Sequence, residues 1–166
     1  MRSLKDRLRD RLRGAERIAV LAVGSELRCD DAAGILAARS IERRLERRAA
    51  GGPLRVFLGH TAPENLTGEI VRYRPTHLIV IDAADLGARP GSCRILGWSK
   101  TGEGGPGTHR MPLGLTLEYL QSSIACDVTI VGIQPASLEA CTPPTRRVRA
   151  AAGRLARAIA EAAPGG

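Results

Sequence analysis

Short apolar runs alternate along the chain with segments in which apolar residues recur at helical spacing. Five of the runs have the length of strands and stand at residues 17–23, 54–59, 77–81, 91–97 and 128–133. The run at 77–81 is continuous instead of alternating, which is typical of a central strand covered on both faces. Strands that alternate with helical patterns predict an α/β domain.

Helical stripes fill most of the intervals between these runs. In the Arg-rich residues 1–16, Leu4, Leu8 and Leu12 recur at every fourth position and predict a basic amphipathic helical extension, which either docks or frays. The glycine- and proline-rich stretch 99–109 predicts a mobile loop. Because the chain has 166 residues and no internal repeat, residues 1–166 fit a single domain. Four further stripes predict helices, at Ile35, Ala38, Ile41 and Leu45, at Leu66, Ile70 and Tyr73, at 113–120, and at Val148, Ala152, Leu155 and Ile159.

The positive charge gathers on three of these predicted helices. Residues 1–17 contribute +4, residues 39–48 contribute +3 and residues 146–157 contribute +5, and the rest of the chain contributes −4, which gives the formal net charge of +8. A nucleic-acid site favours basic residues interleaved with aromatic residues that stack on bases. We therefore expect solvated helix faces and no nucleic-acid partner. The aromatic residues of the whole chain are Phe57, Tyr73, Trp98 and Tyr119.

Membrane spanning and a disulfide framework are both disfavoured. No apolar run approaches the ~20 residues that a membrane-spanning helix needs. The amino-terminal segment is basic and then apolar, but its apolar part is short and acidic residues stand among the arginines, unlike a secretory signal. We expect a cytoplasmic protein with no membrane partner. The cysteines are widely spaced without a C-x-x-C pair, which favours scattered reduced thiols; they are Cys29, Cys93, Cys126 and Cys141.

Candidate chemistry follows the predicted strands. Ligands of a doubly wound sheet bind in the crevice outside the carboxyl ends of its strands. Asp30 and Asp31 follow the first strand, Asp82 follows the central strand, and His109 stands in the glycine-rich loop. Two carboxylates and one imidazole suffice to hold a divalent ion and leave positions open for water or a substrate carbonyl. Such a site supports Lewis-acid chemistry.

Each candidate also has a structural alternative. Asp30 or Asp31 could cap the helix that begins there, Asp82 could be a turn residue, and His109 an ordinary loop histidine. We expect His60 and His77 to be structural. The acidic loop after the first strand would repel a phosphate, and the chain has no G-x-S-x-G elbow, so neither nucleotide binding nor covalent hydrolysis is indicated.

Five sequence blocks carry a resemblance to a known family. They are VGSELRCDDAAG, HTAPEN, RPTHLIVIDAADLGARPG, THRMPL and GIQP, in this order between about residues 18 and 135. Together they resemble the nickel-iron hydrogenase maturation proteases. The resemblance implies a three-layer α/β sandwich with a twisted, mostly parallel five-stranded sheet flanked by helices. It also implies an endopeptidase that removes a carboxyl-terminal extension from the hydrogenase large-subunit precursor after nickel insertion.

The resemblance further assigns roles to individual residues. It implies that Asp31, Asp82 and His109 contact the metal and form the catalytic site, with nickel supplied by the substrate and other divalent cations able to occupy the site. Asp30 then supports this site or caps a helix. Gln134, in the GIQP block, either binds substrate backbone or stabilises a turn.

The first block departs from the family pattern at three positions, which here hold Ser25, Cys29 and Ala32. Cys29 replaces the usual glycine. It is therefore either an additional, softer metal ligand or a spectator. If this position requires a positive φ, the cysteine is strained.

Two other functions stay open at this point. The first is a non-cleaving nickel-dependent docking or chaperone protein for the hydrogenase precursor, built on the same fold. The second is nucleic-acid binding through the arginine-rich helices. The oligomeric state is also open, because the amino-terminal helix could pack on its own domain or on a second copy.

Overall fold

The structure, a computed structural model, describes residues 2–47, 52–98, 111–140 and 143–165. Its strands are β1 (Ile18–Val23), β2 (Leu54–His60), β3 (His77–Ala83), β4 (Cys93–Leu96) and β5 (Asp127–Ile133). Its α-helices are α1 (Leu4–Arg11), α2 (Ala33–Glu46), α3 (Thr67–Tyr73), α4 (Met111–Ser123) and α5 (Arg146–Ala162), and two short 3₁₀ helices are η1 (Cys29–Ala32) and η2 (Pro63–Leu66).

The predicted elements are confirmed, with small differences at their ends. The central strand β3 runs two residues beyond the predicted 77–81, so Asp82 lies inside the strand and not after it. The predicted edge strand at 91–97 is shorter, because β4 covers only Cys93–Leu96. The loop predicted at 99–109 lies outside the described residues.

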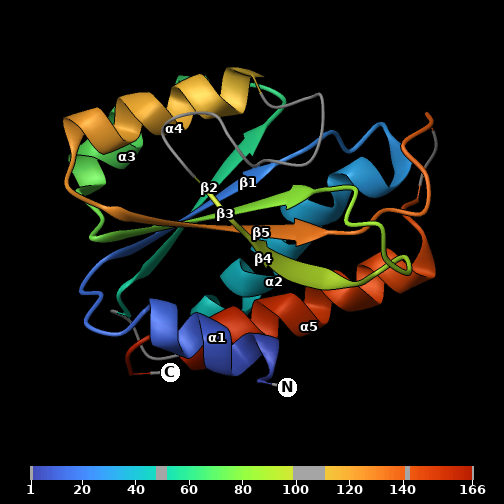
Figure 1. Ribbon diagram of the computed structural model, residues 1–166, viewed down its shortest axis with the longest axis horizontal. Coiled ribbons are helices and arrows are strands. Elements are labelled where there is room, and N and C mark those ends of the chain that lie inside the picture. The colour runs from blue at the N-terminus through green and yellow to red at the C-terminus, as the bar shows by residue number, and fades with distance from the viewer. Residues whose placement is uncertain (1, 48–51, 99–110, 141–142, 166) are drawn as a thin grey trace.

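The five strands form one sheet with the order β2-β1-β3-β5-β4 (Figure 1). The pairs β1–β2, β1–β3 and β3–β5 are parallel, and β4 runs antiparallel to β5 at one edge. From β1 the chain first moves to β2 on one side, and then returns past β1 to β3 on the other. The carboxyl ends of β1 and β3 therefore flank a topological switch point, where α/β sheets bind ligands.

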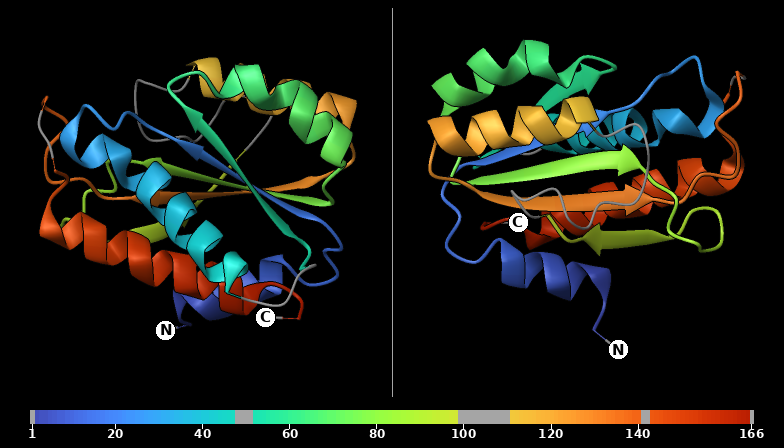
Figure 2. Two further views of the ribbon diagram at one scale, coloured as in Figure 1. Left: turned by 180° about the vertical axis from the view of Figure 1, so that it is seen from behind. Right: turned by 45° about the horizontal axis from the view of Figure 1, so that its top comes forward.

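Helices cover both faces of the sheet, which confirms the three-layer sandwich. Helices α1, α2 and α5 lie on one face and α3 and α4 on the other, as Figures 1 and 2 show. Successive residues of β1 serve the two layers alternately. Val20 packs toward α2 and α5, whereas Ala19 and Leu21 pack toward α3 and α4, as the pleat of a strand requires.

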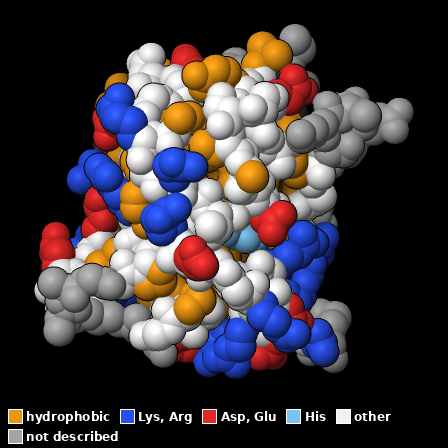
Figure 3. Space-filling model, turned by 90° about the vertical axis from the view of Figure 1, so that its left-hand side faces the viewer, with side chains coloured by type: hydrophobic (Ala, Val, Ile, Leu, Met, Phe, Trp, Pro, Cys, Tyr) orange, Lys and Arg blue, Asp and Glu red, His pale blue; other side chains and the backbone are white. Residues whose placement is uncertain are grey.

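Charged side chains of both signs are scattered over the surface at the amino ends of the parallel strands, among uncharged ones (Figure 3). Some of the basic residues of the helices pair with acidic ones. Lys5 of α1 pairs with Glu161 of α5, and Arg39 of α2 pairs with Glu26 in the loop after the carboxyl end of β1. All four side chains are about 40–45% exposed, so each pair contributes at most about 1 kcal/mol.

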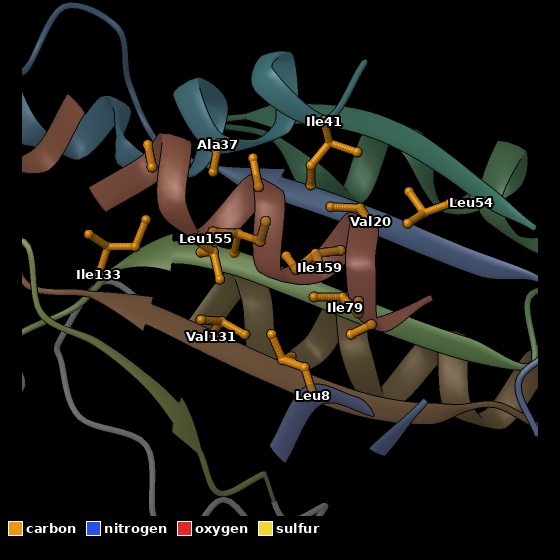
Figure 4. Close-up of a cluster of buried hydrophobic side chains, with 14 of the residues drawn as sticks. Leu8, Val20, Ala37, Ile41, Leu54, Ile79, Val131, Ile133, Leu155 and Ile159 are labelled. Atoms are coloured by element: carbon orange, nitrogen blue, oxygen red, sulfur yellow. The ribbon is translucent and has the colours of Figure 1, made fainter. Parts of the chain in front are cut away.

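The larger hydrophobic core lies between the sheet and helices α2 and α5. Val20, Ile79 and Val131 come from three adjacent strands and pack against Leu155 and Ile159 of α5 (Figure 4). All five side chains are at most 1% exposed. Burial of such aliphatic side chains contributes about 1.5–3 kcal/mol each. This layer therefore fixes the three central strands, including β1 and β3, whose carboxyl ends flank the switch point.

The amino-terminal helix α1 packs on its own domain. Leu8 and Leu12 are 0% and 1% exposed, and both belong to the core cluster that contains α5. Lys5 adds an ion pair of 2.9 Å to Glu161 of α5. Of the two outcomes predicted for the extension, docking is confirmed. In the described part of the chain, no helix combines the length and apolarity that crossing a membrane requires.

Candidate active site

The loop after β1 closes back on itself and positions Asp31. Gly24 has a φ of +135°, and a Cβ at this position would overlap the backbone carbonyl of Asp31. Glycine is therefore required at this position, where the beginning and the end of the loop approach each other. The backbone N–H of Ser25 donates a hydrogen bond of 2.9 Å to Oδ2 of Asp31. This contact holds one carboxylate oxygen of the half-buried Asp31 in place.

The start of α2 lies directly on the carboxyl ends of two strands. A Cβ at Gly34 would overlap the carbonyl oxygens of Val23 in β1 and Ile81 in β3. Because only a glycine allows this approach, the η1–α2 segment lies against the switch point. Asp31 stands three residues before Gly34, and Asp82 directly follows Ile81. The two carboxylates thus come from segments that meet at one edge of the sheet.

Asp82 and Asp31 fit the oxygen-donor part of a divalent-metal site. Asp82 is only 9% exposed and is the penultimate residue of β3. Hard divalent cations and nickel both accept carboxylate ligands. His109, the third predicted ligand, lies outside the described residues. Among the residues that the structure does describe, no group of three His, Cys, Asp or Glu side chains could hold a metal, so the ligand set stays a prediction.

The helix-capping alternative for the two aspartates is wrong. The N-cap position of α2 is Ala32, and neither η1 nor α2 has a side-chain cap hydrogen bond. Asp30 is instead 0% exposed and faces a segment remote in sequence. Its carboxylate accepts hydrogen bonds from the backbone N–H of Ala136 at 2.8 Å and of Thr145 at 2.7 Å, and from Oγ1 of Thr145 at 2.9 Å.

Gln134 holds the loop that follows Asp82. Its Oε1 accepts hydrogen bonds from the backbone N–H groups of Leu86 at 2.7 Å and Ala88 at 3.2 Å. Its Nε2 donates to the carbonyl of Pro135 at 3.2 Å. The side chain is only 9% exposed. Of the two predicted roles, the structure supports stabilisation of a turn.

Cys29 corrects the prediction that the thiols are reduced. It is 3% exposed, has a φ of +44° and takes part in a disulfide. A sulfur in a disulfide carries no thiolate, so Cys29 in this state is not a metal ligand. The φ is positive, which is the condition under which a cysteine at this position is strained. The first loop contacts a segment more than a hundred residues away, which local spacing does not reveal.

The remaining described cysteines are free thiols. Burial raises the pKa of both Cys93 and Cys126 above the ordinary value, so neither thiol is activated as a nucleophile. Cys141 lies outside the described residues. These two thiols therefore offer no nucleophile to the candidate site.

The two histidines among the described residues lie at opposite ends of the parallel strands. His77 begins β3, is 3% exposed, and its Nε2 lies 2.9 Å from Oγ1 of Thr129, which supports the structural role predicted for it. His60 ends β2 beside the first loop, where its carbonyl accepts the N–H of Gly24 at 2.9 Å. Its Nδ1 lies 3.6 Å from Oε2 of Glu26. His60 therefore contacts the loop that carries Asp31, and its place at the end of the strand beside β1 was a usable signal for this.

The fold and the site together define an α/β protein whose segments carrying Asp31 and Asp82 meet at the switch point of its sheet. Residues 36–162 match the HycI family, described as hydrogenase maturation protease. This chain belongs to that family, and it is therefore a hydrolase of the maturation-protease type. The first of the five sequence blocks lies before the matched range, and the other four lie within it.

Individual relatives agree with this assignment. The hydrogenase 3 maturation protease of Escherichia coli (strain K12) is 37% identical over 117 residues, which are 70% of this chain and 71% of that protein. The crystal structure of the nickel-iron hydrogenase maturation protease HycI from Thermococcus kodakarensis KOD1 superposes with a TM-score of 0.79 at 27% identity, over 93% of this chain and 97% of that one. The solution structure of the endopeptidase HycI from Escherichia coli has a TM-score of 0.71 at 30% identity, over 90% and 94%.

Proposed function

We propose that this protein is an endopeptidase that removes a carboxyl-terminal extension from the precursor of a nickel-iron hydrogenase large subunit after nickel insertion. One observation carries the proposal beyond family membership. Asp31 and Asp82 are fifty-one residues apart in sequence, yet Gly34 brings their segments together at the switch point. Two carboxylates at this place suit a substrate that presents a divalent ion together with a peptide bond.

In this proposal Asp31 and Asp82 bind the nickel that the precursor carries, and His109 completes the set. The ion supplies Lewis-acid polarisation of the scissile carbonyl. The Ser25 N–H fixes one oxygen of Asp31 and leaves the other to face the substrate. Asp82 is nearly buried, so water is largely excluded from its surroundings and its charge acts strongly on a bound cation.

The test follows the intact mass of the precursor. Nickel-loaded and nickel-free precursor are each mixed with the wild-type protein and with Asp31→Asn. We expect loss of a carboxyl-terminal peptide only from the loaded precursor and only with the wild type. Asp127→Asn serves as the matched control, because this exposed aspartate lies at the amino end of β5. It should process the loaded precursor at the wild-type rate.

The non-cleaving docking protein makes a different prediction for the same mixture. It would form a complex with the loaded precursor, with no change in precursor mass over many hours. That result would refute the endopeptidase. Equal processing of nickel-free precursor would refute the requirement for nickel but leave the endopeptidase in place.

A further inference from the structure

A short segment after β5 connects the loop that carries Asp31 with the loop that follows Asp82 and strand β3. We call residues 134–137 the bridging segment. On one side it is bound by the loop after β3, because Leu86 and Ala88 both donate backbone N–H groups to Oε1 of Gln134. The backbone of Gln134 adds two hydrogen bonds of 2.9 Å, from the N–H of Gly91 and to the carbonyl of Ser92.

On its other side the bridging segment is bound by Asp30. Oδ2 of Asp30 accepts hydrogen bonds from the N–H groups of Ala136 at 2.8 Å and Ser137 at 3.4 Å. The N–H of Asp30 returns a hydrogen bond of 3.2 Å to the carbonyl of Ser137. Only Pro135, whose φ is restricted by its ring, separates the hydrogen bonds of Gln134 from those of Ala136 and Ser137. The loop of Asp31 and the loop after Asp82 are thus joined through a few hydrogen-bonded residues.

Thr145 connects the same carboxylate to the start of α5. Its N–H donates to Oδ1 of Asp30 at 2.7 Å, and its hydroxyl donates to Oδ2 at 2.9 Å. Because α5 packs firmly on the sheet, this contact ties Asp30 to the rigid part of the domain. Asp30 therefore joins three segments that are far apart in sequence, namely η1, the bridging segment and the start of α5.

Stability alone is a poor explanation for a fully buried carboxylate here. Removing the charge from water carries a large cost, which hydrogen bonds to the charge offset without a clear net gain. What several charge-assisted hydrogen bonds do provide is a defined geometry. Two carboxylates that bind one ion need a fixed position relative to each other, because catalytic groups displaced by about 1 Å lose much of their effect.

We propose that Asp30 and Gln134 are positioning residues, which set the separation between Asp31 and Asp82 through the bridging segment. The proposal rests on the proposed function for the catalytic role of Asp31 and Asp82. The coupling itself does not depend on that function, because it concerns only the loop that carries Asp31, the bridging segment and the loop after β3. A disturbance at Asp30 is transmitted through residues 134–137 to the loop after β3.

The first experiment tests this transmission without any substrate. Hydrogen exchange is measured on the wild type and on Asp30→Asn, in which an amide NH₂ replaces one of the two acceptor oxygens. We expect the amides of Leu86 and Ala88 to exchange at least tenfold faster in the variant, although neither contacts residue 30. The amide of Arg74, which is bonded to the carbonyls of Ile70 and Val71 at the end of α3, should not change.

Two outcomes of the exchange measurement would overturn the proposal. Faster exchange confined to residues 136–145 would show that Asp30 organises only its own neighbours. Equal acceleration at Arg74 would show a general loss of stability and no transmission. Either result is independent of whether the protein cleaves a precursor.

The second experiment separates positioning from folding by kinetics on the nickel-loaded precursor. Thr145→Val removes the hydroxyl bond to Asp30, and Thr145→Ser keeps it. We expect Thr145→Val to lower kcat about tenfold with KM unchanged, and Thr145→Ser to restore at least half of the wild-type kcat. A Thr145→Ser variant as slow as Thr145→Val would contradict the role of the hydroxyl. If the wild type itself fails to cleave, the proposed function falls, and the exchange result alone decides whether the bridging segment couples the loops.

Discussion

The two ends of the parallel strands, which we call the amino edge and the carboxyl edge of the sheet, bury their polar groups in different ways. At the amino edge, His77 makes one side-chain contact, to Thr129 on the neighbouring strand, and burial lowers its pKa so that the neutral imidazole is favoured. At the carboxyl edge, Asp30 is equally buried but accepts four hydrogen bonds from segments remote in sequence. A neutral pair needs only strand register, whereas a buried carboxylate needs loops that aim several donors at it.

The largest expected effect on processing comes from replacing one buried polar residue at each end of the parallel strands. Asp82→Asn should lower kcat on loaded precursor at least a thousandfold, about 4 kcal/mol in transition-state stabilisation, with a melting temperature close to the wild type. His77→Leu should do the reverse, because it removes the hydrogen bond to Oγ1 of the buried Thr129, a loss of about 1–3 kcal/mol, but lies at the opposite ends of the parallel strands from Asp82. Processing rates and thermal melts on both variants check this. A large loss of kcat in His77→Leu would break the distinction between the edges.

A second contrast uses two glycines. Gly34→Ala places a Cβ against the carbonyls of Val23 and Ile81, and should destabilise the fold by about 1–3 kcal/mol and slow processing. Gly153→Ala lies in α5 with no atom within 4 Å of the added carbon, and should stabilise it by about 0.5–1 kcal/mol. Urea unfolding measures both. A Gly34→Ala variant as stable as the wild type would mean that α2 does not press on the strand ends as closely as the structure has it.

The smallest effect is the dependence of stability on pH at the amino edge. Burial lowers the pKa of His77 below its ordinary 6.5, with Asp127 opposing and Arg11 reinforcing this shift. Between the lowered folded pKa and 6.5 the unfolded chain binds more protons, so the stability contributed by neutral His77 is present above 6.5 and is lost as the pH falls. The slope from this one group is at most about 1.4 kcal/mol per pH unit. Melting curves from pH 7.5 to 5.5 should show a smaller decrease for His77→Gln than for the wild type, and parallel curves would exclude this residue as the cause.

Most of the fold could be predicted because its causes are local. The apolar runs and the helical stripes each reflect one element that buries one or two faces, so their periodicity identifies the ends of strands and helices within about three residues. The position of Asp31 and Asp82 at one edge was also predictable, because carboxyl ends of parallel strands share an edge. That β3 continues to Ala83 was not, since its last pairs depend on the register with β5.

The sequence by itself determined the α/β class, the central strand, the family blocks and the two carboxylates at strand ends, because each of these depends on neighbours along the chain. Only the tertiary structure decided that Asp30 binds Ala136 and Thr145, that Gln134 holds the loop after β3, and that Cys29 is in a disulfide. These contacts join residues separated by up to 115 positions. The choice among possible partners for a buried polar group depends on which loops the packed sheet brings together, and no local pattern in the sequence records that choice.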